Sequence, residues 1–170
     1  VVEAARSEGH QVGVANYNSP EQTVISGDVL SVKEVSLRLQ GAGARRVLPL
    51  KVAGAFHAPA MAPATRELEP HLRVATIREP RVPFYSNVTG TRLDDPDAIR
   101  DALVRQVESP VRWKQICQAL ADRGMRCALE LGPGKVLQGL MRSVRRDVEV
   151  VSLGNGTDLE RAKTTLVAAR

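Results

Sequence analysis

Residues 11–40, QVGVANYNSPEQTVISGDVLSVKEVSLRLQ, hold the pattern on which the fold depends. The segment QVGVANYN predicts a strand, SPEQ supplies a turn with a proline, and TVIS predicts a second strand that closes a hairpin. Asp28 is suited to cap a helix over the rest of the stretch. Three apolar residues would then share one face of that helix: Val32, Val35 and Leu39. The glycines at 41–43 mark its end.

The flanking segments extend this unit in both directions. VVEAARSEGH, at the start, favours a helix, and RRVLPLKV at 45–52 predicts a third strand. The order helix, strand, strand, helix, strand over residues 1–52 is a split βαβ, or ferredoxin-like, pattern whose first strand is missing. Because the chain opens in a helix-like segment without an initiator methionine, we expect it to be a piece of a longer protein.

Residues 53–170 predict a second α/β unit in which strands and helices alternate. Strands are expected at RVPFYSNV, RCALEL and VEVVSL. Helices are expected from just after His57 to about Leu72, over DDPDAIRDALVRQV, over SPVRWKQICQALADRG with Ser109 as its cap, over VLQGLMRSV and over DLERAKTTLVAA. This alternation favours a mainly parallel sheet with helices on both faces.

Composition narrows the classes of function. The chain has 170 residues, of which 43% are hydrophobic, so it is long enough for a real core, while only 3% are aromatic and few bases of a nucleic acid would find stacking partners. Its net charge of +5 comes from scattered residues and favours an acidic partner protein or a phosphate-bearing ligand. Cys117 and Cys127 have no metal spacing and are expected to be buried free thiols. Without a signal peptide or an apolar run of about 20 residues, the expected compartment is the cytoplasm.

His57 is the leading candidate for chemistry. It stands where a strand-like run gives way to a helix, and such a transition projects a side chain into the crevice where open α/β sheets bind ligands. An imidazole can take and return a proton near neutral pH. The alternative is a structural histidine with satisfied hydrogen bonds. The strained G-x-S-x-G elbow that presents a nucleophilic serine occurs nowhere in the 170 residues.

Two further motifs have competing interpretations. LGPGKVLQGL, at 131–140, lacks the spacing of a phosphate-binding loop and is better explained as a tight turn between a strand and a helix. Asn16 and Asn18 lie two residues apart on a predicted strand, so their side chains would face the same way. They either line a cleft with their amides or cap the turn that follows.

Five segments together carry a resemblance to a known family: ANYNSPEQTVISGD, GARRVLPLKVAGAFHAPAM, VPFYSNVTG, SPVRWKQ and ELGPGKVLQGL. In this order, from about residue 10 to 145, they resemble the malonyl-CoA:acyl carrier protein transacylases and the acyltransferase domains of fatty-acid and polyketide synthases. The resemblance implies a ferredoxin-like small subdomain over 1–52, followed at 53–170 by the C-terminal part of an α/β-hydrolase-like acyltransferase subdomain.

The resemblance also implies a reaction. In this family a serine takes the malonyl group from malonyl-CoA as an ester, and the phosphopantetheine thiol of acyl carrier protein removes it, with no tightly bound cofactor and no metal. His57 matches the family's general base, and carbonyls near the GPGK turn, at Leu131 and Gly132, would orient it. Phe56 matches the xAFH motif associated with malonyl selectivity. The expected substrate-binding residues are completed by Asn16, Asn18 and Gln106.

The chain departs from the family in one large respect. The GHSxGE serine, the oxyanion loop and the arginine that pairs with the malonyl carboxylate are absent from these residues. We therefore expect an N-terminal lobe as a necessary partner, beside acyl carrier protein and malonyl-CoA, and an inactive fragment without it. Neither nucleic acid nor a membrane is expected as a partner. The competing hypothesis is a non-enzymatic module of ferredoxin-like type that binds a carrier protein or RNA.

Overall fold

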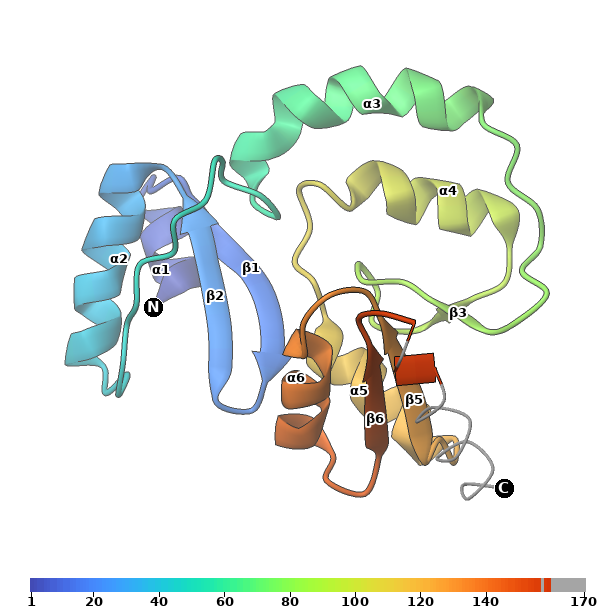
Figure 1. The fold of residues 1–170 in the computed structure, drawn as a ribbon. Helices are drawn as coiled ribbons and strands as arrows, with labels where there is room; N and C mark the ends of the chain where they lie inside the picture. The colour runs from blue at the N-terminus through green and yellow to red at the C-terminus, as the bar shows by residue number, and fades with distance from the viewer. Residues whose placement is uncertain (157, 160–170) are drawn as a thin grey trace.

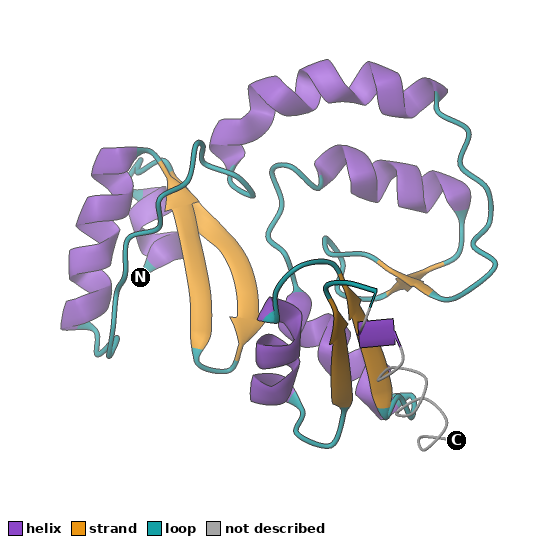
Figure 2. Cartoon of the chain, in the orientation of Figure 1, coloured by secondary structure: helices purple, strands orange, loops and turns teal. Residues whose placement is uncertain are grey.

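The computed structural model describes residues 1–156 and 158–159, which form a mixed α/β chain (Figures 1 and 2). In chain order the elements are α1 (Val2–Ser7), β1 (Val12–Ser19), β2 (Gln22–Gly27), α2 (Val29–Gly41), the 3-10 helix η1 (Pro59–Met61), α3 (Ala62–Val74), β3 (Phe84–Tyr85), β4 (Arg92–Leu93), α4 (Pro96–Arg105), α5 (Trp113–Asp122), β5 (Cys127–Leu131), α6 (Val136–Val144) and β6 (Glu149–Leu153). No helix among the described residues is long and apolar enough to cross a membrane.

The first unit confirms the hairpin and the capped helix. β1 and β2 pair in antiparallel fashion, with irregularities in register near Ala15 and Asn18. Asp28 caps α2, because its carboxylate accepts the Ser31 backbone N–H at 2.9 Å. α1 and α2 lie against the hairpin, where Ala5, Val12 and Val35 form a small buried core (Figure 1).

The predicted strand at 45–52 is wrong. This segment has no strand pairing to any described residue, and its apolar side chains face outward, with Leu48, Leu50 and Val52 being 64%, 62% and 67% exposed. The physical reason is that strand-forming side chains do not make a strand unless a neighbouring edge takes up the backbone hydrogen bonds. The predicted division of the chain into 1–52 and 53–170 stays a prediction.

The prediction of a mainly parallel sheet is also wrong. The described strands form three separate two-stranded sheets, and only β5–β6 is parallel. β3 covers two residues of the expected RVPFYSNV, because the chain turns back at once: the Gly90 N–H donates to the Ser86 carbonyl at 2.9 Å. β5 lies within the predicted RCALEL, β6 within VEVVSL, and α6 coincides with VLQGLMRSV.

α4 begins as predicted, and α5 does not. Asp95 caps α4 by accepting the Ala98 N–H at 2.7 Å, with Pro96 at the first helical position. α5 was expected to start from a cap at Ser109, but its N-cap residue is Arg112. The reason is a contact made by Val111, whose N–H donates to the Ala15 carbonyl at 2.8 Å and whose carbonyl accepts from Tyr17 at 2.9 Å. These bonds to β1 keep the chain extended past Ser109.

A second core lies between α5, α6 and the β5–β6 sheet. Its buried members are Cys117, Ala121, Met141, Val148 and Val150. Burial raises the pKa of the Cys117 thiol to about 12, so this cysteine is an inert core residue, as expected. Cys127, in β5, is a free thiol that is only half-buried. The predicted closing helix DLERAKTTLVAA lies outside the described residues except for 158–159.

Candidate active site

His57 has an unusual backbone conformation. Its φ is +61°, and among the described residues no other residue except glycine has a positive φ. Histidine tolerates the left-handed region better than most residues, but such a conformation persists only where the surroundings determine it. Here the His57 N–H donates to the Val107 carbonyl at 2.9 Å. The loop after α4 therefore holds the backbone that carries the imidazole.

The imidazole itself is oriented by the same loop. Nδ1 lies 3.0 Å from the backbone oxygen of Gln106, the C-cap residue of α4. A carbonyl oxygen only accepts hydrogen bonds, so this contact requires the proton to be on Nδ1. Nε2 then carries the lone pair and has no hydrogen-bond partner among the described residues. This is the tautomer that a general base needs.

The orienting carbonyl differs from the one that the sequence predicted. Leu131 and Gly132 were expected to supply it, but neither has a hydrogen bond to His57 among the described residues. Gly132 instead donates its N–H to Leu153 at 3.1 Å, and the Leu131 side chain is 76% exposed. The position of Gln106 at the end of the DAIRDALVRQ segment could have indicated its carbonyl as the acceptor, because the last carbonyls of a helix lack intrahelical partners. The role found for Gln106 is that of its backbone, whereas a side-chain role toward substrate stays a prediction.

Phe56 lies directly before the imidazole and stays half exposed, at 49%. Its ring lies over Gly54: a Cβ atom on that glycine would stand 3.5 Å from Phe56 Cε2. A Cβ at position 54 would therefore only touch the ring in ordinary van der Waals contact. Phe56 therefore presents an apolar surface next to the candidate base.

The two asparagines have different surroundings. The register irregularity near Asn18 breaks the simple alternation on which the shared face was predicted, and its Nδ2 donates to Gln22 Oε1 at 3.1 Å across the hairpin turn. Asn18 thus fits the turn-capping interpretation. Asn16 is half-buried and forms an isolated parallel bridge with Val111. The structure therefore brings Asn16 close to the loop that holds His57.

The GPGK turn is held by a buried carboxylate. Glu130, in β5, accepts the N–H groups of Leu137 at 2.9 Å and Gln138 at 3.0 Å, and the Ser152 hydroxyl at 2.9 Å. Gly132 and Gly134 adopt φ values of +129° and +98°, which the turn requires. A phosphate bound at the start of α6 would need these two amides, and Glu130 already accepts their hydrogen bonds. The structure therefore supports a tight turn here and argues against a phosphate-binding loop.

Glu130 leads to a prediction about stability. Burial by itself raises its pKa, but the amides of Leu137 and Gln138 and the Ser152 hydroxyl outweigh burial and hold the pKa below the ordinary 4.5. Replacing Glu130 with alanine leaves buried donors unpaired, so we expect the free energy of unfolding in urea to fall by about 1–3 kcal/mol. Glu130→Gln, which keeps one acceptor oxygen, should lose less.

The pH dependence of that loss has a definite sign. A carboxyl whose pKa is lower in the folded state contributes stability above its unfolded pKa, and the contribution disappears as the pH falls through the folded pKa. The gap in unfolding free energy between the native sequence and Glu130→Gln should therefore be full at pH 7 and shrink below pH 4.5. A gap that stayed constant down to pH 3 would show that the charge of Glu130 is not what holds the turn.

His57 lines neither of two cavities that lie among the described residues. One, of about 380 Å³, lies beside the GPGK turn and includes Lys135, Gln138 and Ser152 in its wall. The other, of about 640 Å³, lies under the loop from Ile77 to Phe84. The part of the chain that the structure describes contains no group of three histidine, cysteine or acidic residues placed to hold a metal ion. His57 itself is half-buried.

Comparisons of the sequence with known proteins all point to one family. The family model described as "Acyl transferase domain" matches residues 1–165. A malonyl CoA-acyl carrier protein transacylase from Bacillus subtilis is 36% identical over 166 residues, which is 98% of this chain and 52% of that protein. The chain thus spans about half the length of the curated relatives it matches.

Solved structures agree with the sequence match. An acyl carrier protein S-malonyltransferase from Vibrio cholerae superimposes with a TM-score of 0.89 at 35% identity, over 95% of this chain and 53% of that one. A malonyl-transacylase solved in complex with a type II polyketide synthase acyl-carrier protein gives 0.90 at 32% identity, over 96% and 54%. The mixed α/β fold described above therefore corresponds to part of these enzymes.

Proposed function

Because this chain belongs to the acyl transferase domain family, we propose that it is the histidine-bearing half of an enzyme that moves malonyl from coenzyme A to acyl carrier protein. The observation that carries the proposal is the pair of hydrogen bonds that His57 donates to the loop after α4, from its backbone N–H at 2.9 Å and from Nδ1 at 3.0 Å. The second of these puts the proton on Nδ1 and leaves Nε2 able to accept another. The proposed pathway is fatty-acid or polyketide synthesis in the cytoplasm.

In the proposed reaction His57 moves protons in both half-reactions. A serine oxygen attacks the thioester carbonyl of malonyl-CoA while Nε2 takes the hydroxyl proton, the C–S bond breaks, and the imidazolium returns that proton to the departing thiolate. In the second half the phosphopantetheine thiol gives its proton to Nε2 while its sulfur attacks the carbonyl carbon of the seryl ester. The ester C–O bond breaks, and the imidazolium returns the proton to the serine oxygen. The imidazolium formed each time is stabilised by the Gln106 carbonyl.

The remaining site residues have proposed roles in binding. Phe56 restricts the space beside the acyl carbon, while Asn16 and Gln106 offer amides to the polar part of the substrate and Asn18 braces the hairpin. The 170 residues hold no G-x-S-x-G elbow, so the serine would come from sequence outside them. The family's arginine motif for the malonyl carboxylate is also absent from them, so that cation would come from the same sequence. The net charge of +5 would speed the encounter with an acidic carrier protein.

The test is transfer of radiolabelled malonyl from coenzyme A to carrier protein by the complete gene product. We expect label on the carrier protein that bears phosphopantetheine and none on the same carrier protein without it, because only the former offers a thiol. If neither form of the carrier protein were labelled and the protein shifted RNA in a gel, the result would instead support the non-enzymatic binding module.

A further inference from the structure

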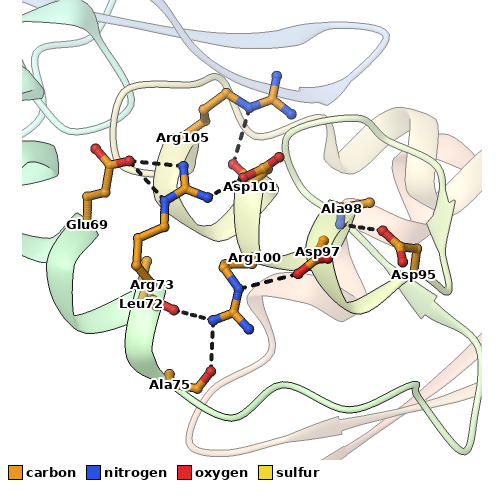
Figure 3. Close-up of polar contacts among 10 residues, drawn as sticks. All are labelled: Glu69, Leu72, Arg73, Ala75, Asp95, Asp97, Ala98, Arg100, Asp101 and Arg105. Atoms are coloured by element: carbon orange, nitrogen blue, oxygen red, sulfur yellow. Dashed lines mark hydrogen bonds and ion pairs between the residues drawn. The ribbon is translucent and has the colours of Figure 1, made fainter.

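Helices α3 and α4 are joined by a polar cluster, shown in Figure 3, that no catalytic role explains so far. Its centre is Arg100 of α4, whose side chain is only 15% exposed. Nη1 of Arg100 donates to the Leu72 carbonyl and, at 2.8 Å, to the Ala75 carbonyl. Both acceptors lie at the C-terminal end of α3, where helix carbonyls lack intrahelical partners. Arg100 therefore fastens the end of α3 to α4.

The end of α3 needs such an anchor because Pro70 lies inside the helix. Proline has no N–H, so the intrahelical bond that would close on the Arg66 carbonyl is missing and the turn that follows is weakened. Leu72 belongs to that turn, and Ala75 is the C-cap residue of α3. The contacts of Arg100 thus replace, from a neighbouring helix, part of the support that the proline removes.

Arg73 makes a second link between the same helices. Its Nη1 donates to Asp101 of α4 at 2.7 Å, while Nε and Nη2 share Oε1 of Glu69 at 3.1 Å and 2.9 Å (Figure 3). The Arg73 and Asp101 side chains are about half exposed, at 48% and 55%. Ion pairs this exposed add little to stability. The Arg73–Asp101 pair nevertheless links α3 directly to α4.

The candidate base lies where α3 begins and α4 ends. His57 precedes η1 and α3, and Gln106 and Val107 follow α4, so the bonds from His57 to Gln106 and Val107 join the helices at one end. Arg100 and Arg73 join the C-terminal end of α3 to the middle of α4, where Arg100 and Asp101 lie. Two helices tied at two separate places cannot slide along each other without breaking one of the ties.

We propose that Arg100, assisted by Arg73, is a positioning residue for the base: it fixes α3 against α4 and so keeps the Gln106 carbonyl on Nδ1 of His57. This inference rests on the proposed role of His57 in malonyl transfer. It assigns to Arg100 an effect on the tautomer of an imidazole that it does not touch. A residue that only added stability would have no such effect.

The experiment compares Arg100→Met, Arg100→Lys and Arg73→Met in the complete gene product, with Arg92→Met as matched control. Within the part of the chain that the structure describes, Arg92 makes only a local ion pair, with Asp94 at 2.7 Å, and its side chain is 40% exposed. Two quantities are measured: the fraction of His57 that carries its proton on Nδ1, from imidazole nitrogen NMR shifts, and kcat and KM for malonyl transfer. Gel filtration and circular dichroism check that each variant folds.

We expect Arg100→Met to lower the Nδ1–H fraction and to reduce kcat on the order of 10-fold with KM for malonyl-CoA nearly unchanged, because misplacement of a catalytic group costs rate more than binding. Arg100→Lys should restore part of both. Arg73→Met should shift the Nδ1–H fraction and kcat in the same direction as Arg100→Met. Because it is a milder surface change, it keeps the inference testable if Arg100→Met fails to fold. Arg92→Met should change neither.

Two outcomes overturn the inference. One is an unchanged Nδ1–H fraction in folded Arg100 and Arg73 variants, whatever happens to kcat. The other is a tautomer shift of the same size in Arg92→Met. The tautomer is measured without turnover, so it reports on Arg100 even if the enzyme does not transfer malonyl. Loss of the proposed function would appear separately, as absent transfer in the unmodified protein.

Discussion

Replacing His57 with alanine in the complete gene product should lower kcat for malonyl transfer by about 10²–10⁴-fold, the usual contribution of a general base. Both proposed half-reactions pass a proton through Nε2, so the loss should appear in formation of the acyl-enzyme as well as in its discharge. The measurement is a rapid-quench time course of labelled acyl-enzyme, followed by transfer to carrier protein.

The φ of +61° at position 57 calls for a second variant. Alanine is strained in this region, so part of its effect would be structural, whereas asparagine adopts the region readily. His57→Asn should therefore keep the loop intact and still lose at least 10²-fold, by the same estimate for a general base. His71→Ala, on an exposed position of α3, is the matched control and should be neutral. Full activity in His57→Asn would contradict the assignment of the base.

Replacing Phe56 with alanine should raise the preference for methylmalonyl-CoA over malonyl-CoA by about 10–200-fold relative to the native sequence, the range expected for one methyl group in a fitted pocket. The ring is half exposed beside the base, so its removal opens space next to the acyl carbon without emptying a core. The quantity to measure is the ratio of kcat/KM for the two substrates in direct competition.

The matched control for this change is Phe56→Tyr, which keeps the ring and should keep the selectivity. The bulk argument predicts that the ratio changes because methylmalonyl transfer rises. If the ratio in Phe56→Ala changed only because malonyl transfer fell, the ring would be supporting the loop and not selecting the substrate. The nearby Gly54 has no side chain to take over the vacated space.

Several elements were predictable because their signals are local. Asp28 and Asp95 precede helices that each lack partners for their first amides, and the structure shows both carboxylates accepting one of those amides. The helix VLQGLMRSV and the strand CALEL were likewise found where the sequence predicted them. Caps, prolines and apolar periodicity act over a few residues, so the chain displays them before it folds.

Two of the failures involve partners distant in the chain. The segment at 45–52 has the composition of a strand but finds no paired edge among the described residues. Ser109 has the chemistry of a cap, yet Val111 is drawn into bonds with β1, about a hundred residues earlier, and α5 starts later. No local pattern shows which distant backbone will compete for a residue.

The candidate site divides in the same way. The sequence by itself determined the family resemblance, the histidine at the start of a helix and the phenylalanine beside it, because these are matters of residue type and spacing. Only the tertiary structure decided that the carbonyl on Nδ1 belongs to Gln106 and not to Leu131 or Gly132. The reason is geometric: all three carbonyls have the same chemistry, and which of them lies 3.0 Å from the imidazole depends on how α3 and α4 pack.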